Sequence, residues 1–243
     1  MMRQFCAGLT LLTRIPVPVR WSYSIEDVAR SMRWFPLIGA LIGLVYAGTS
    51  WLCALRLPAL VSATLIVVVE AVLTGALHFD GLADTADGFG GGRTREDVLR
   101  IMRDHAVGAY GVVAVALAVA LKITTVSALI DRHNAVVYLV IAPALGRWSS
   151  VVASAMLPYA RRDERGVPDL IGHTEWMVAT VFAIALAAGF AQWRGVLACV
   201  LVAAVSVIWC VICRRRIGGV TGDTLGALTE VTELSVYLLA VGC

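Results

Sequence analysis

The residues best suited to chemistry form an acidic cluster in the segment His78-Phe-Asp80-Gly-Leu-Ala-Asp84-Thr-Ala-Asp87. Its aspartates stand at i, i+4 and i+7, so on a helix they share one face. The residues between them are Gly, Leu, Ala and Thr, which cannot neutralise the repulsion between the carboxylates. A divalent cation can, and Mg²⁺ binds carboxylates together with substrate phosphates. We therefore predict a metal site formed by Asp80, Asp84 and Asp87.

A glycine-rich run, Gly88-Phe-Gly-Gly-Gly92, follows this cluster. Glycine adopts many backbone conformations, so we expect the run to be flexible and to offer free N–H groups near the metal. The alternative is a solvated acidic helix end that the glycines terminate. Such a face normally carries Lys or Arg at i+3 or i+4, and their absence here favours the metal site.

A second glycine-rich turn, Gly218-Gly-Val-Thr-Gly222, stands immediately before an apolar segment. The N-terminus of a helix presents unpaired N–H groups and a positive dipole end, which together bind phosphate. We therefore expect Gly219, Thr221 and Gly222 to bind a phosphate group of a substrate or cofactor.

Acidic residues also follow this turn. Asp223, Glu230 and Glu233 stand at i, i+7 and i+10, again on one helical face. Ionised acids are costly inside a membrane, so the two glutamates should face the interior of the bundle and be paired. We expect all three to bind metal. The alternative is that Glu230 and Glu233 pair across helices with Arg147 or Lys122.

Between the two acidic sets lies the tripeptide Arg103-Asp104-His105. An arginine binds phosphate through two parallel hydrogen bonds, which suits Arg103 to a diphosphate. Asp104 is a further candidate metal ligand, and His105 can accept a proton near neutral pH. We assign catalytic roles to Asp84, Asp104 and His105. For His105 the alternative is a solvated histidine at a membrane boundary.

These residue types favour phosphoryl or phosphodiester transfer. The sequence has no Walker A motif, which argues against ATP-driven pumping, and no Ser or Cys nucleophile with an oriented base. Bound metal would bridge a diphosphate and neutralise developing charge while the attacking and leaving oxygens stand in line.

The elements that position these residues are predicted to be membrane helices. The chain of 243 residues is 59% hydrophobic and only 15% charged, against about 25% charged in a typical soluble domain. A spanning helix needs about 20 apolar residues. We predict a single all-α domain over 1–243, a polytopic bundle with about seven spans, at 35–55, 58–78, 108–130, 135–157, 176–193, 195–213 and 224–241.

Arginine placement predicts the orientation of the spans. One side carries 15 arginines, in the N-terminal segment and in the loops 79–107, 158–175 and 214–223, against three on the other side, Arg56, Arg132 and Arg194. By the positive-inside rule the N-terminus and these loops are cytoplasmic. We expect the loops to form an active-site face at the cytoplasmic (inner) membrane. Lysine is confined to Lys122, which excludes a Lys-rich tail for nucleic acid.

Several motifs closely resemble the cobalamin synthase family, also called adenosylcobinamide-GDP ribazoletransferase. The resemblance runs from about residue 5 to residue 235. It rests on Phe79-Asp-Gly-Leu-Ala-Asp-Thr-Ala-Asp87-Gly, Met102-Arg-Asp104 with Gly108 and Gly111, Gly218-Gly-Val-Thr-Gly-Asp223-Thr-Leu-Gly-Ala, Leu12-Thr-Arg-Ile-Pro-Val-Pro18 and Trp34-Phe-Pro-Leu-Ile-Gly39.

The resemblance implies the last assembly step of the cobalamin nucleotide loop. Adenosylcobinamide-GDP and alpha-ribazole (or its 5′-phosphate) would give adenosylcobalamin (or its phosphate) and GMP, with Mg²⁺ as cofactor. The lipid bilayer, a homo-oligomer and other nucleotide-loop enzymes are the further partners to expect, and nothing in the sequence selects an oligomeric state. Carried over by motif, the metal and diphosphate residues are Asp80, Asp84, Asp87 and Asp104, completed by Asp223, Glu230 and Glu233.

Two other classes of protein remain as alternatives. One is another membrane transferase that acts on a metal-bound diphosphate, such as a CDP-alcohol phosphotransferase or an aromatic prenyltransferase. The other is a cation or proton transporter that uses Glu70, Glu230 and Glu233 as a relay inside the membrane. A transporter needs acids near the bilayer midplane, whereas an enzyme gathers them on one face. Most acids here lie with the arginines, which favours an enzyme.

Overall fold

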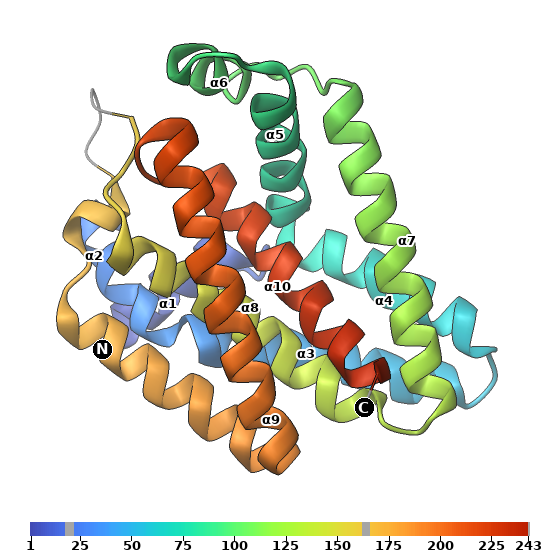
Figure 1. The fold of residues 1–243 in the computed structure, drawn as a ribbon. Helices are drawn as coiled ribbons and strands as arrows, with labels where there is room; N and C mark the ends of the chain where they lie inside the picture. The colour runs from blue at the N-terminus through green and yellow to red at the C-terminus, as the bar shows by residue number, and fades with distance from the viewer. Residues whose placement is uncertain (18–21, 162–165, 243) are drawn as a thin grey trace.

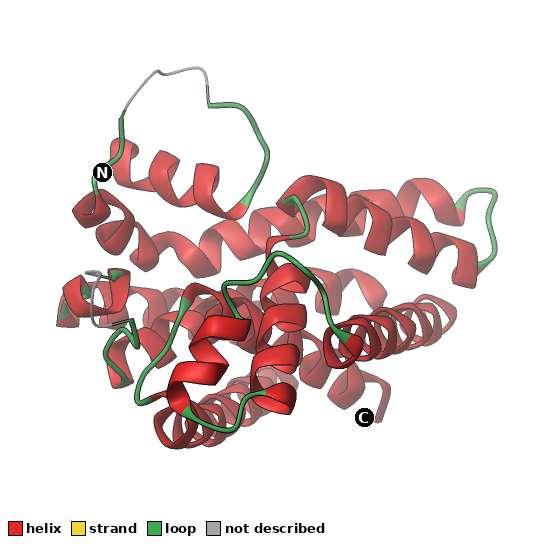
Figure 2. Ribbon diagram, turned by 90° about the horizontal axis from the view of Figure 1, so that it is seen from above, coloured by secondary structure: helices red, strands yellow, loops and turns green. Residues whose placement is uncertain are grey.

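The computed structural model describes residues 1–17, 22–161 and 166–242, and within these ranges it contains helices and no strand (Figure 1, Figure 2). Three of the arginines assigned to the cytoplasmic side, Arg20, Arg162 and Arg165, lie outside the described residues. The elements are α1 (Met2–Leu12), α2 (Ile25–Ser31), η1 (Met32–Trp34), α3 (Phe35–Ala54), α4 (Ala59–Thr74), α5 (Leu77–Gly91), α6 (Arg95–Ile101), α7 (Ala109–Asp131), α8 (Ala135–Met156), η2 (Val167–Leu170), α9 (His173–Ile217) and α10 (Gly222–Gly242).

The prediction of an all-α, polytopic membrane protein is confirmed. In the described chain, five helical segments are long and apolar enough to cross a membrane, namely Ile25–Ala54, α7, α8, α9 and α10. The pair α4 and α5 passes the same test as one span with a bend of 90°.

The 45-residue α9 accounts for two of the predicted spans. Its helical conformation is interrupted at Gln192, which has φ 51° and ψ −130°. A Cβ atom at Gly195 would overlap the carbonyl oxygen of Ala187, so the two halves of α9 pack directly against each other. Figure 1 shows the chain turning back on itself near the label α9. The halves correspond to the predicted spans 176–193 and 195–213.

Two helices, α5 and α6, occupy most of the connection 79–107 between predicted spans, so its aspartates do lie on a helix. The chain bends at Gly75 and Ala76, both in the left-handed region, and continues as α5. The glycines expected to be flexible are packed instead. A Cβ atom at Gly88 would lie 2.5 Å from Cγ of Met102, and one at Gly90 would lie 2.6 Å from the ring of Tyr110. These glycines let α6 and α7 approach α5 closely.

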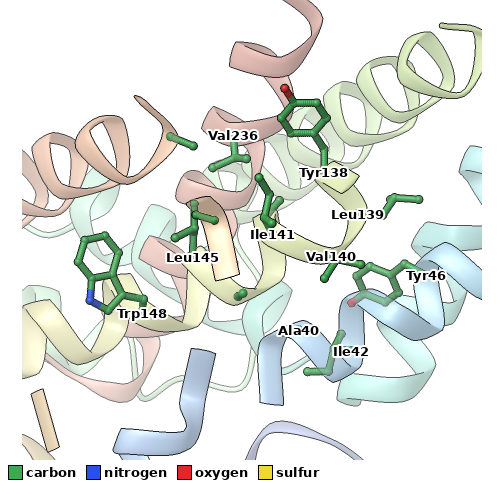
Figure 3. Close-up of a cluster of buried hydrophobic side chains, with 14 of the residues drawn as sticks. Ala40, Ile42, Tyr46, Tyr138, Leu139, Val140, Ile141, Leu145, Trp148 and Val236 are labelled. Atoms are coloured by element: carbon green, nitrogen blue, oxygen red, sulfur yellow. The ribbon is translucent and has the colours of Figure 1, made fainter. Parts of the chain in front are cut away.

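The core is centred on α8, which packs against α3, α9 and α10. Figure 3 shows its side chains Ile141 and Leu145 near Val236 of α10, with Leu139 pointing away from them. All four are fully buried. The lipid-facing surface is equally apolar, so burial of apolar area does not select this arrangement. Membrane helices are held together chiefly by close packing and polar contacts.

Close packing of α3 on α8 depends on Gly39 and Gly43, which form a GxxxG pattern. A Cβ atom at Gly39 would lie 2.7 Å from Cα of Ala144, and one at Gly43 would lie 2.6 Å from Cα of Val140. The obstructing atoms belong to the backbone, so they cannot rotate away. Gly48, on the same helix, has no atom within 4 Å of the equivalent position.

We expect Gly43→Ala to destabilise the protein by about 1–3 kcal/mol, because the added methyl group overpacks the contact between α3 and α8. Gly48→Ala should be neutral or stabilising, since alanine is the better helix former by up to about 1 kcal/mol and meets open space. Thermal unfolding of both variants in detergent micelles checks the prediction. Equal midpoints for the two variants would contradict the packing role of Gly43.

Candidate active site

A cavity of about 390 Å³ lies between the N-terminal helices and the pair α5 and α10. Its polar part is formed by His78 and Asp80 of α5 together with Asp223 of α10, and Tyr159 contributes from the connection between α8 and α9. The rest of the wall is largely apolar and comes from α1, α2, η1 and the start of α3. Two of the sequence-predicted residues, Asp80 and Asp223, are therefore brought together at one cavity.

Glycines bring these two aspartates together. The backbones of α5 and α10 cross so closely that a Cβ atom at Gly81 would lie 2.7 Å from the carbonyl oxygen of Asp223. On the other helix, a Cβ atom at Gly226 would lie 3.5 Å from Cα of Gly81. Gly81 directly follows Asp80 in the sequence, and Gly226 follows Asp223 by about one helical turn. The spacing of Gly and Asp in both motifs thus sets the distance between the helices.

The carboxylates at this crossing outnumber the cations. Asp223 accepts a hydrogen bond of 2.9 Å from the guanidinium of Arg161 and one of 3.3 Å from the hydroxyl of Thr221. Asp80 and Asp84 form no hydrogen bond or ion pair with any described residue. The charged neighbours of Asp84 include the acids Asp80, Asp87 and Asp223 and the cation Arg161. This excess of negative charge suits a divalent cation, whose preferred ligands are oxygens.

Asp87 is used differently from the other two aspartates of its cluster. Its carboxylate accepts hydrogen bonds from the backbone N–H groups of Gly108, at 2.7 Å, and Gly111, at 2.9 Å. These groups belong to the first turn of α7, where N–H groups have no partner within the helix. Asp87 therefore holds the start of α7, a role that sequence reasoning missed. The pair of glycines three residues apart was its only signal.

We expect Asp87→Ala to lower the free energy of unfolding by about 2 kcal/mol, the upper range for loss of a helix cap, because two buried N–H groups lose their acceptor. Asp87→Asn keeps one carbonyl oxygen and should lose less. Hydrogen exchange at Gly108 and Gly111 should accelerate in the alanine variant. Unchanged exchange there would show that the carboxylate does not hold the helix.

The glycine-rich turn mainly shapes the start of α10. Gly218, with φ 75°, ends α9, and Gly219 packs on the carbonyl of Pro158. The hydroxyl of Thr224 accepts a hydrogen bond of 2.8 Å from the backbone N–H of Thr221, and the hydroxyl of Thr221 accepts one of 3.2 Å from the backbone N–H of Thr224. Of the three residues expected to bind phosphate, only Gly222 lines the cavity. Gly219 and Thr221 act by positioning the helix.

The tripeptide Arg103-Asp104-His105 lies on an exposed turn after α6 and does not line the cavity. Asp104 accepts a hydrogen bond of 3.1 Å from the N–H of Ala106, within the turn itself. The structure therefore does not bring these residues to Asp80 and Asp223. Their catalytic and binding roles stay predictions.

Glu230 and Glu233 lie with Glu70 in a buried group apart from the cavity, and their role as metal ligands stays a prediction. Oxygens of these residues and of Glu70 lie within 4.8 Å of one another, but the ammonium of Lys122 occupies their midst. Its Nζ atom lies 2.7 Å from Glu230 and 3.3 Å from Glu233. Seven residues of helix also separate Glu230 from Asp223 by about 10 Å along the axis. The alternative weighed above, pairing across helices, is what the structure shows.

Arg147 extends this buried network toward the cavity. It forms an ion pair with Glu233, and its guanidinium lies 3.4 Å from Nδ1 of His78, which lines the cavity. Because each of the three acids inside the bundle is paired with Lys122 or Arg147, they do not resemble an open relay for transported cations. The structure thus disfavours the transporter interpretation.

The arginine-bearing segments meet at one end of the molecule. Arg95 of α6 donates to the carbonyl oxygens of Ile217, at 2.8 Å, and Ala160, at 2.5 Å. Arg216 donates to the carbonyl oxygens of Phe89 and Gly92. These contacts join residues from all three predicted loops at the C-terminal end of α5 and just before the start of α10.

Fold and site together define a polytopic helical membrane protein with an acidic cavity at the end where its arginine-bearing segments gather. The chain matches the family described as cobalamin-5-phosphate synthase over residues 4–241. It belongs to that family and is an enzyme of the transferase class.

Curated relatives support the assignment over the whole chain. An adenosylcobinamide-GDP ribazoletransferase from Syntrophobacter fumaroxidans is 37% identical, with 100% of this chain and 99% of the relative covered. Enzymes of the same name from Shewanella frigidimarina and Shewanella amazonensis are 39% and 40% identical; 98% and 97% of this chain and 94% and 93% of those relatives are covered. No solved structure matches the chain.

Proposed function

We propose that this protein joins adenosylcobinamide-GDP to alpha-ribazole, or to its 5′-phosphate, with release of GMP. In this reaction a ribose hydroxyl of the ribazole attacks the phosphorus nearest the cobinamide. A new phosphorus–oxygen ester bond forms, the bond to the bridging oxygen of the diphosphate breaks, and GMP leaves with that oxygen. The hydroxyl proton passes to a base. The products are adenosylcobalamin, or its phosphate, and GMP.

The observation that carries the proposal is the pair Asp80 and Asp223 on one cavity, in a chain that matches ribazoletransferases along its whole length. A carboxylate such as Asp80, which has no cationic partner among the described residues, would repel a bare diphosphate. Such a carboxylate binds it well when a divalent cation lies between the two. The same arrangement would serve little purpose for a neutral substrate.

We propose Mg²⁺ as the cofactor, held by Asp80 and Asp223 together with oxygens of the substrate diphosphate, with Asp84 adding negative charge beside them. When bound, the ion would withdraw charge from the diphosphate and make GMP a better leaving group. The residues of the chain orient the parts around it. Arg161 holds the carboxylate of Asp223 in place, and the crossing at Gly81 keeps α5 and α10 at a fixed separation. Gly222, at the N-terminus of α10, supplies a helix end suited to a phosphate oxygen.

We further propose that the cavity faces the cytoplasm at the inner membrane. The arginine-bearing segments and the cavity share one end of the molecule, and such segments remain on the cytoplasmic side of a bacterial membrane. Nucleotide substrates would reach the cavity from that side. Labelling of single cysteines placed in these segments, in intact cells and in inverted vesicles, tests the orientation.

The direct test of the function is GMP release by the purified protein in lipid vesicles. Adenosylcobinamide-GDP and alpha-ribazole 5′-phosphate should together yield GMP and the joined corrinoid in equal amounts, and only with Mg²⁺ present. Omission of either substrate, or addition of EDTA, serves as the control. GMP formed without ribazole would indicate hydrolysis instead of transfer, and absence of product would overturn the proposal.

A further inference from the structure

The cavity has an apolar wall that the proposed chemistry does not use. It is formed by Leu12 of α1, Val28 of α2, Met32 of η1 and Phe35 of α3. Among the lining residues, all within the described chain, the only acidic or basic side chains other than His78 are Asp80 and Asp223. Val28 is partly exposed, whereas Leu12, Met32 and Phe35 are nearly fully buried and show only a small area to the cavity.

We propose that this apolar wall binds the aromatic base of the ribazole substrate and sets which bases the enzyme accepts. The inference rests on the proposed function and assigns one part of the cavity to one part of one substrate. The volume of the cavity decides which part of the two substrates can enter it. A cavity of about 390 Å³ accommodates a nucleotide, whereas a corrin ring with its amide side chains is several-fold larger.

The polarity of the wall distinguishes between the two remaining candidates, guanine and the base of alpha-ribazole. Guanine presents donors and acceptors along its edges, and burying them against an aliphatic wall without partners is costly. The base of alpha-ribazole is a fused aromatic ring that is largely hydrocarbon. It can lie against Ile25 and Val28, the partly exposed apolar residues that α2 contributes to the wall. The wall therefore matches the base better than it matches guanine.

The geometry of the reaction agrees with this placement. In phosphoryl transfer the attacking and leaving oxygens stand in line on opposite sides of the phosphorus. A ribazole seated in the cavity would direct its ribose toward Asp80 and Asp223, at the polar part of the wall. GMP and the corrin would then lie outside the cavity, where the arginine-bearing segments gather and where space is not limiting.

The test uses substitutions at Val28 and two-substrate kinetics in lipid vesicles. Val28→Phe adds bulk to the wall and should raise KM for alpha-ribazole 5′-phosphate at least about 10-fold, with KM for adenosylcobinamide-GDP within twofold of wild type. Val28→Ala enlarges the wall and should shift the ratio of kcat/KM toward a ribazole with a bulkier base. Val45→Phe makes the same substitution on the lipid-exposed side of α3 and should change neither constant.

Binding of alpha-ribazole 5′-phosphate alone, measured by calorimetry, gives a readout that needs no turnover. The wild type should bind it and Val28→Phe should bind it at least about 10-fold more weakly. Normal turnover with unchanged KM for ribazole in both Val28 variants would overturn the wall assignment and leave the proposed function intact. A bound lipid chain that Val28→Phe displaces, with unchanged ribazole kinetics, would assign the wall to lipid. Absence of GMP from the wild type would instead refute the function itself.

Discussion

Asp80→Asn is expected to lower the rate of GMP release at least about 100-fold while the protein remains folded. Asp80 lines the cavity and forms no ion pair or hydrogen bond with any described residue, so it has no structural partner to lose. Asparagine keeps the shape and removes the charge. Loss of one preorganised electrostatic contact at a reacting centre typically costs a factor of about 100–1000 in rate. Because the neighbouring Asp84 and Asp223 repel Asp80, the substitution should leave stability unchanged or raise it.

The decisive measurement pairs initial rates with a Mg²⁺ titration. If Asp80 holds the ion, its loss should also raise the Mg²⁺ concentration needed for half-maximal rate. Asp131→Asn is the matched control, because Asp131 is exposed at the end of α7 distant from the cavity (Figure 1). A folded Asp80→Asn variant that keeps more than half the wild-type rate would remove Asp80 from the proposed site.

Lys122→Met is expected to destabilise the protein by about 3–5 kcal/mol, the usual cost of removing one partner from a buried ion pair. Lys122 is fully buried and lies 2.6 Å from Glu70 as well as within reach of Glu230 and Glu233. Without its ammonium, these carboxylates would face one another with only Arg147 nearby. Methionine has similar length, so the effect should arise from charge and not from a cavity.

Thermal unfolding in micelles measures this effect, and a second substitution isolates its cause. Lys122→Met combined with Glu230→Gln removes one cation and one anion together, so it should recover part of the lost stability. Leu121→Met, on the lipid-exposed face of the same helix, is the control. A Lys122→Met protein as stable as wild type would show that the acids are not held by the lysine. A double variant no better than the single one would exclude charge repulsion as the cause.

Local sequence patterns predicted most of the fold. Apolar length indicated α3, α4, α7, α8, both halves of α9 and α10, because the bilayer imposes the same length on every span, but it did not indicate α1, α2, α5 or α6. The bend between α4 and α5 was missed, because a short apolar run continues through Gly75 without a change in composition. The glycines at 88–92 were misread for a related reason. Glycine permits flexibility and close packing alike, and only the neighbours decide between them.

For the candidate site, the sequence determined by itself that acids gather in two helical motifs and that glycines accompany them. Helical periodicity carries that information, since it assigns residues to a face. Periodicity does not reveal which helix or side chain that face contacts. Only the tertiary structure decided that Asp80 and Asp223 share a cavity, that Asp87 caps α7, and that Lys122 lies among the glutamates. These outcomes depend on contacts between residues 21 to 143 positions apart in the chain. Such contacts arise from the way the helices cross, which no local pattern encodes.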